Sequence, residues 1–190
     1  MKDTISLISL SATAVGVAIH GLGHILAARA VGVRMAALRR THTGFRLVTD
    51  TAFPTYDAEL YCALGGPMAN LAAALLCRLT LLPLRIAPDF SACFIPFSLF
   101  LGLLNLLPLH SFDGARILTC LLCAPHRRFP SFDPHTAQRI VQVLSCCLLV
   151  ALWLLSIYVL LRRGSALSLY VFCLQLFRTA ALDGAQKPSI

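Results

Sequence analysis

Charged residues are scarce in this sequence of 190 residues. Asp, Glu, Lys and Arg together make up 13% of the positions, while hydrophobic residues make up 58%. A soluble globular domain carries roughly a quarter charged residues, so the composition argues against a soluble fold. Four long stretches contain no Asp, Glu, Lys or Arg at all: Thr4–Ala28, Leu60–Cys77, Phe90–Phe112 and Ile140–Leu161. Each has or approaches the ~20 residues that a helix needs to cross the hydrocarbon core of a membrane.

The pattern predicts an all-α polytopic membrane protein with about five transmembrane helices. A short interfacial β-hairpin is expected after the first helix, within Arg34–Asp57, because this segment is rich in β-prone and turn residues. We expect a single membrane-embedded domain over residues 1–190, with a core at about 5–123 and accessory helices at about 137–181. The predicted helices cover about 5–33, 58–82, 90–106, 137–161 and 166–181, with prolines interrupting or ending the second and third.

Basic residues lie between the apolar stretches, so the net charge of +8 does not indicate nucleic-acid binding. The first apolar stretch is too long for a secretory signal peptide and is expected to be retained as a span. Loops rich in Lys and Arg tend to be cytoplasmic, which predicts an N-terminus outside and a C-terminus in the cytoplasm. The expected cytoplasmic side holds Arg34, Arg39, Arg40, Arg46, Arg127, Arg128, Arg178 and Lys187, and the other side holds Arg78, Arg85, Arg162 and Arg163.

Eight cysteines would suggest disulfides in a small secreted domain. Most of these lie inside apolar stretches, however, and we interpret them as small, polarizable core residues. Cys120 and Cys123 form a C-x-x-C pair. Because no second pair follows at the spacing of a zinc ribbon, this pair alone does not predict a metal or redox site.

His20 and His24 lie deep in the first apolar stretch, where an ionisable side chain is a candidate for function. Four residues apart on a helix, they project from one face with ~6 Å of rise between them. Two imidazoles in this arrangement can bind one metal ion, although histidines that only form interhelical hydrogen bonds would show the same spacing. Asp113 adds a carboxylate whose burial is unfavourable unless it is paired or bound to a cation. Two imidazoles and one carboxylate suit Zn²⁺, with a fourth position open to water.

These residues stand in motifs that resemble those of the site-2 protease family, which are intramembrane zinc metalloproteases. That family carries an H-E-x-x-H helix and, later, an N-x-x-P-x-x-x-x-D-G segment that supplies the third zinc ligand. A G-P-x-x-N element lies between the two motifs, and an arginine often follows the D-G. The resemblance covers residues 18–118. The matching positions are His20 and His24, then Gly66, Pro67 and Asn70, then Asn105, Pro108, Asp113 and Gly114, and finally Arg116.

The resemblance implies metal ligation by His20, His24 and Asp113, and a substrate-binding role for Asn70, Asn105 and Pro108. Asn70 and Asn105 would line the site, where they would position the substrate backbone or stabilise the oxyanion. Interhelical hydrogen bonding is the other role open to each of them. The short chain is similar to the compact bacterial members, which include proteases that process a sporulation sigma-factor precursor. This similarity implies a location in a bacterial cytoplasmic membrane. The regulatory CBS domain that some of those members carry is not seen in this sequence, which weakens that substrate assignment.

One position departs from the family pattern in a way that affects catalysis. Gly21 follows His20 where the family has a glutamate. That glutamate acts as the general base in the family reaction, and glycine has no group that accepts a proton. Metal ligation does not require this glutamate, so the chain can bind a metal ion without being able to catalyse hydrolysis. His110 is a possible substitute base. Ala115, where a second glycine is frequent, is a smaller departure.

Two functional hypotheses follow from the resemblance. The first is an intramembrane zinc metalloprotease that cuts a regulatory substrate in or near a membrane segment, and is inactive as written because of Gly21. The second is a non-catalytic zinc-binding pseudoprotease that holds a client peptide. The expected partners are membrane lipid and a single-span or membrane-associated protein. The hairpin segment Arg34–Asp57 would either add its edge to an extended substrate or hold lipid headgroups through its arginines.

Overall fold

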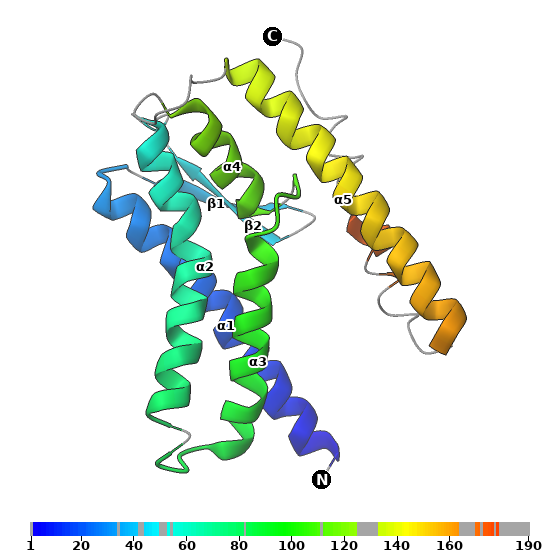
Figure 1. The fold of residues 1–190 in the computed structure, drawn as a ribbon. Coiled ribbons are helices and arrows are strands. Elements are labelled where there is room, and N and C mark those ends of the chain that lie inside the picture. Colours follow the sequence, from blue (N-terminus) through cyan, green and yellow to red (C-terminus); the bar gives the residue numbers. More distant parts are fainter. Residues whose placement is uncertain are drawn as a thin grey trace.

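Helices make up most of the described chain (Figure 1). The computed structural model describes residues 2–33, 35–41, 44–49, 53, 55–81, 83–110, 112–124, 133–163, 170–171, 173–176 and 178. In chain order the elements are α1 (Lys2–Ala30), β1 (Met35–Thr41), β2 (Gly44–Thr49), α2 (Tyr56–Leu79), α3 (Pro88–Asn105), α4 (Asp113–Cys123) and α5 (Pro134–Arg163).

Four of the helices are long and apolar enough to cross a membrane. The candidate spans are Leu7–Ala30, Tyr56–Leu79, Pro88–Asn105 and Pro134–Arg162. Many large apolar side chains on them are exposed, and Leu161 is 81% exposed. Contiguous apolar surface of this extent suits lipid rather than water. The chain is therefore a mostly helical, integral membrane protein. Of the fifth predicted helix, only residues 170–171, 173–176 and 178 are described as helical, so a count of five spans stays a prediction.

Local sequence signals explain where the helices begin and end. α1 stops at Ala30 rather than at the predicted 33, and Gly32 follows with a φ of 75°, in the left-handed region that ends many helices. α2 begins after Thr55, whose side-chain oxygen accepts a hydrogen bond from the backbone N–H of Ala58 at 3.1 Å. Pro88 and Pro134, which we expected in loops, each open a helix, because proline lacks only an N–H that the first turn leaves unpaired.

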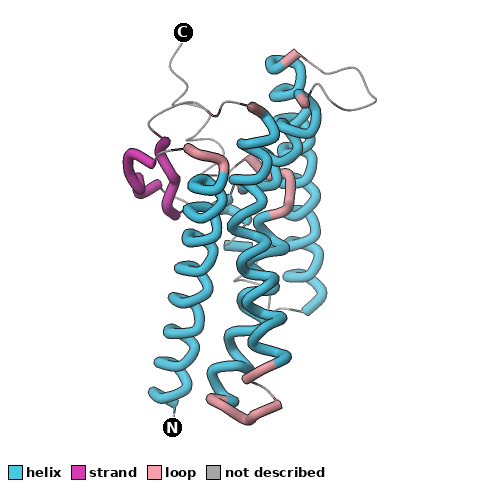
Figure 2. Tube along the Cα trace, turned by 90° about the vertical axis from the view of Figure 1, so that its left-hand side faces the viewer, coloured by secondary structure: helices cyan, strands magenta, loops and turns pink. Residues whose placement is uncertain are grey.

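Helices α1, α2 and α3 pack against one another in all three pairs (Figures 1 and 2). Glycines allow the closest approach, between α1 and α2. A Cβ placed on Gly65 would lie 2.7 Å from the Ala27 Cβ, and one placed on Gly23 would lie 2.6 Å from the Ala69 Cβ. Small residues at such a crossing bring two backbones together, as is common between helices in membranes. This close contact holds the histidine-bearing part of α1 against α2.

A turn between α3 and α4 sets the position of the first residue of α4, Asp113. Leu109 in this turn is buried and packs with Leu149 of α5. The Ser145 hydroxyl of α5 donates a hydrogen bond to the Pro108 carbonyl at 2.6 Å. α5 packs against α4 and runs diagonally along one side of the molecule (Figure 1). The turn is thus fixed by α5 on one side and by the end of α3 on the other.

Strands β1 and β2 pair antiparallel, with Arg39 opposite Arg46 and an irregularity near Met35. They lie beyond the end of α1 that is away from the N-terminus (Figure 2). Both fall inside the segment in which we expected a hairpin. The location of this pair at a membrane interface, and its role in binding substrate or headgroups, stay predictions.

Candidate metal centre

His20 and His24 project from the same face of α1. Their ring centroids are 4.8 Å apart and the rings are nearly perpendicular, at 82°. Both side chains are mostly buried, with 16% and 14% of their surface exposed. The helical spacing therefore brings two imidazoles together inside the helical bundle, as the sequence predicts.

Asp113 meets both histidines from the first turn of α4. Its Oδ2 lies 3.2 Å from the His20 Nε2 and 3.1 Å from the His24 Nε2, and the two Nε2 atoms are 3.2 Å apart. Ligand atoms at 2.0–2.1 Å from a tetrahedral Zn²⁺ lie about 3.3 Å from one another. The three atoms thus form a triangle with the edge length that a shared zinc ion requires. They are the one group of possible metal ligands found within the described part of the chain.

The contacts within this triangle require a proton or a metal ion between its atoms. The His24 Nδ1 lies 2.7 Å from the Cys62 carbonyl oxygen, which can only accept, so His24 Nδ1 carries a proton. The His24 Nε2, on the other side of the ring, faces the Asp113 carboxylate at 3.1 Å. Burial alone would raise the pKa of Asp113, but the hydrogen bonds with His20 and His24 outweigh burial and lower the pKa to about 2. An anion facing a lone pair at this distance is stable only with a proton or a metal ion between them.

Gly66 forms the floor of the site on α2. A Cβ at this position would lie 2.7 Å from the His20 Nε2, 2.8 Å from the His20 Cε1, and closer still to the His24 Nε2. Any side chain would occupy the space next to the ligand atoms. The absence of a side chain at position 66 is therefore part of the geometry of the site.

The fold is similar to that of a solved protein structure. The site-2 protease from Methanocaldococcus jannaschii matches with a TM-score of 0.66 and 20% sequence identity, over 96% of this chain and 80% of that one. The chain has a site-2 protease fold. No protein-family model matches the sequence, and no curated protein matches it. At this identity the likeness concerns the fold, and the residues of the site have to be judged from their own geometry.

Within the site-2 protease fold, the three residues predicted to bind substrate lie in different surroundings. Asn70 is completely buried, and its Nδ2 lies 3.4 Å from the His20 Nδ1. Asn105, at the end of α3, donates to the Leu101 carbonyl of its own helix at 2.8 Å. Pro108 is held by Ser145, as described above. The structure thus brings Asn70 into contact with the site, whereas no hydrogen bond in the described chain joins Asn105 to His20, His24 or Asp113.

Gly21 is partly exposed and follows the ligand His20 on α1. A Cβ at this position would meet no atom within 4 Å. This contrasts with Gly66, where a Cβ would collide with both imidazoles. Packing therefore does not require glycine at position 21, because a Cβ would lie in open space there.

Arg116 links α4 to α2 and so helps to place Asp113, three residues before it. Its Nε and Nη2 both lie 3.4 Å from the Glu59 Oε1, and its guanidinium lies 5.8 Å from the centre of the Phe53 ring. Both charged side chains are about one third exposed, so the ion pair contributes modestly to stability. Neither Glu59 nor the Cys62 carbonyl was identified from sequence. A backbone carbonyl leaves no signal in the sequence, because every residue has one.

Cys120 and Cys123 are both buried in α4. Burial, with a further contribution from the nearby Glu59 carboxylate, raises the pKa of Cys120 to about 12, and burial also raises the pKa of Cys123. Thiols with raised pKa values stay protonated at neutral pH and are poor nucleophiles and metal ligands. The C-x-x-C pair therefore behaves as part of the packing between α4 and α2.

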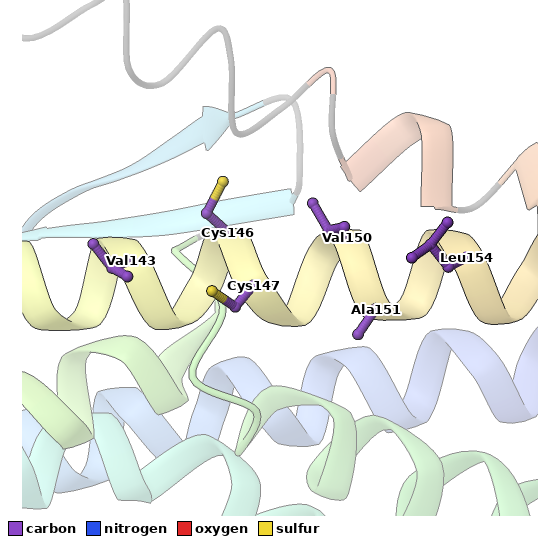
Figure 3. A pocket seen from close by; sticks show the side chains of 6 residues that line it. All are labelled: Val143, Cys146, Cys147, Val150, Ala151 and Leu154. Carbon is purple, nitrogen blue, oxygen red and sulfur yellow. The ribbon is translucent and has the colours of Figure 1, made fainter.

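An open groove of about 580 Å³ lies along an exposed face of α5, and none of the candidate metal ligands lines it (Figure 3). Its lining side chains recur at intervals of three and four residues and carry no charge, so it lacks the polar groups that a catalytic site needs. The lining residues are Val143, Cys146, Cys147, Val150, Ala151 and Leu154.

Proposed function

We propose that this chain is an intramembrane zinc metalloprotease scaffold of the site-2 protease type that has lost its general base. The observation that carries the proposal is the triangle of ligand atoms from His20, His24 and Asp113, with edges of 3.1–3.2 Å. The fold and the resemblance of the three motifs to the site-2 protease family support it. By that resemblance the substrate is a single-span or membrane-associated regulatory protein, cut in or near its membrane segment, and the catalytic core is residues 5–123.

The residues of the site divide the chemistry between binding and proton transfer. When bound, zinc polarises a scissile carbonyl and lowers the pKa of a water molecule towards ~7. His20, His24 and Asp113 would hold the metal. A glutamate at position 21 would lie about 100° around α1 from His20, where its carboxylate takes a proton from the water and passes it to the leaving amine. Gly21 can neither accept the proton nor pass it on, so we expect the chain with Gly21 to be inactive in hydrolysis.

Within the described residues, no hydrogen bond joins a further histidine or acidic side chain to His20, His24 or Asp113. Glu59 lies two turns before Gly66 on α2, which is a rise of about 10 Å, and its carboxylate is paired with Arg116. His110 is exposed in the turn before α4, and within the described residues no hydrogen bond links it to the ligand triangle. His110 is nevertheless the first residue to test if hydrolysis is observed.

A pseudoprotease that holds zinc and a client peptide without cutting it is the second candidate. The observation that favours it is the contrast between an intact ligand triangle and a missing base. In a chain that had lost every function of the site, nothing would keep the three metal ligands and Gly66 together. A chain that only binds a peptide near its metal needs the metal ligands and does not need the general base.

The decisive experiment restores the base. The unsubstituted chain, Gly21→Glu and Gly21→Gln are purified in detergent micelles and incubated with internally quenched single-span peptides. Glutamine has nearly the size of glutamate but accepts no proton at neutral pH. General acid–base assistance accelerates a reaction by roughly 10²–10⁴-fold. Gly21→Glu is therefore expected to cleave the peptides at least about 10²-fold faster than the other two chains. A metal chelator should abolish the activity.

Two results would contradict this proposal. If the unsubstituted chain cleaves in a chelator-sensitive way, another group is the base, and His110→Ala should then remove the activity. If Gly21→Glu binds zinc and remains as inactive as Gly21→Gln, the scaffold does not support hydrolysis, and the client-binding function is the one to retain.

A further inference from the structure

Asn70 contacts the ring of His20 on the side opposite to Asp113. It lies on α2, one turn after Gly66, and none of its surface is exposed. Its side chain meets the Nδ1 of His20, while the Nε2 of the same ring faces Asp113. Asn70 therefore touches a candidate ligand on the edge of the ring that points away from the metal position.

A histidine that binds a metal through Nε2 must keep its proton on Nδ1, and this proton needs an acceptor. His24 has one, because the Cys62 carbonyl lies 2.7 Å from its Nδ1. For His20, Asn70 is the hydrogen-bond partner of Nδ1 in the described chain. An asparagine side chain offers either an NH₂ donor or a carbonyl acceptor to the same neighbour, depending on how its amide is turned.

The amide of Asn70 as it stands presents Nδ2 to His20, at 3.4 Å, and its Oδ1 has no hydrogen-bond partner despite complete burial. In that orientation the proton of His20 sits on Nε2, from which it can be donated to Asp113. A metal ion between His20 and Asp113 displaces this proton. The proton of the neutral ring is then on Nδ1, and only the unpartnered Oδ1 of Asn70 can accept it.

We propose that Asn70 is a positioning residue of the metal centre. Its Oδ1 accepts a hydrogen bond from the Nδ1–H of His20, after the amide has turned over, and this fixes the tautomer that directs the Nε2 lone pair at the metal. Asn70 is thus assigned to the metal rather than to the substrate. The inference rests on the proposed function, because it requires a metal on His20. Loss of such an outer partner typically lowers metal affinity by about 10–100-fold.

Two nearly isosteric substitutions separate this role from a structural one. Asn70→Asp keeps an acceptor for the Nδ1 proton and removes the NH₂ donor. Asn70→Leu removes both. If Asn70 only donates a hydrogen bond between helices or fills space, a buried aspartate would be at least as harmful as leucine. If it accepts from His20, aspartate preserves zinc binding and leucine does not. Ser98→Ala is the matched control, because Ser98 is also completely buried with an unpartnered oxygen but has no hydrogen bond to either histidine.

Zinc affinity is measured on the full chain in detergent micelles by competition with a chelating dye. The expected result is a 10–100-fold weaker affinity for Asn70→Leu, and affinities within about threefold of the unsubstituted chain for Asn70→Asp and Ser98→Ala. Equal binding by Asn70→Leu, or equal losses in Asn70→Leu and Asn70→Asp, would overturn the assignment of Asn70 alone. Absence of zinc binding in the unsubstituted chain would instead overturn the proposed function on which it rests.

A spectroscopic measurement tests the assignment even if Asn70→Leu does not fold. In the zinc-loaded unsubstituted chain with ¹⁵N-labelled histidine, the nitrogen shifts report which ring atom carries the proton. His20 is expected to show a protonated Nδ1 and a coordinated Nε2, and Asn70→Asp should preserve this pattern. A protonated Nε2 on His20 with zinc bound would overturn the proposal.

Discussion

Replacing Gly66 by alanine should destroy the metal site while changing only one methyl group. The new Cβ would lie 2.7 Å from the His20 Nε2 and closer still to the His24 Nε2. Ordinary contacts begin near 3.4 Å, so both rings have to move by about 0.7 Å or more. Ligand distances tolerate changes of only about 0.2 Å. We therefore expect zinc affinity to fall at least about 100-fold, the upper end of what an outer-sphere change costs.

Gly21→Ala is the matched control for this experiment. It introduces the same methyl group on the facing helix, next to a ligand, where nothing lies within 4 Å of the added carbon. Its zinc affinity should equal that of the unsubstituted chain, and alanine should favour the helix by up to about 1 kcal/mol. Both variants are compared by competition with a chelating dye and by circular dichroism in micelles. If Gly66→Ala binds zinc as tightly as Gly21→Ala, the packing of the histidines against α2 is not as described.

Three further predictions concern the ligand, the helix crossing and the hairpin. Asp113→Asn should lose stoichiometric zinc, measured by elemental analysis after gel filtration, because a neutral amide replaces the anionic ligand; full occupancy would exclude Asp113 as a ligand. Gly23→Ala should destabilise the fold by about 1–3 kcal/mol through overpacking against α2, seen as a lower midpoint of thermal unfolding in micelles, and an unchanged midpoint would contradict the close crossing. Replacing residues 35–49, which hold β1 and β2, with a glycine-serine segment of equal length in the Gly21→Glu background should abolish peptide cleavage but leave zinc bound; unchanged cleavage would refute a docking role.

The sequence was most informative where a regular element fixes the geometry. Two histidines four residues apart on an apolar helix have to share a face, and the structure brings them to 3.2 Å. The pairing with Asp113 followed from a different argument, namely that a carboxylate among apolar residues needs a cation. That argument predicts that a partner exists, and the resemblance to the family motifs was needed to say which one.

The supporting contacts could not be predicted, because they depend on how helices cross. Gly66 faces the imidazoles only because Gly23 and Gly65 let α1 and α2 approach closely. The same crossing places the Cys62 carbonyl against His24 and Asn70 against His20. None of these contacts has a spacing rule along the chain. Helix ends were misplaced by a few residues for a simpler reason, since Pro88 and Pro134 open helices that a proline-rich segment suggested would begin later.

X-ray absorption at the zinc edge tests the metal centre most directly. The purified full chain, loaded with one equivalent of zinc in micelles, should show a first shell of nitrogen and oxygen atoms at about 2.0–2.1 Å. The outer-shell scattering should fit two imidazoles, and it should fall to one imidazole in His24→Ala if zinc still binds. Sulfur at about 2.3 Å, which would place the metal on cysteines such as Cys120 and Cys123, or a failure to retain zinc at all, would contradict a site made of His20, His24 and Asp113.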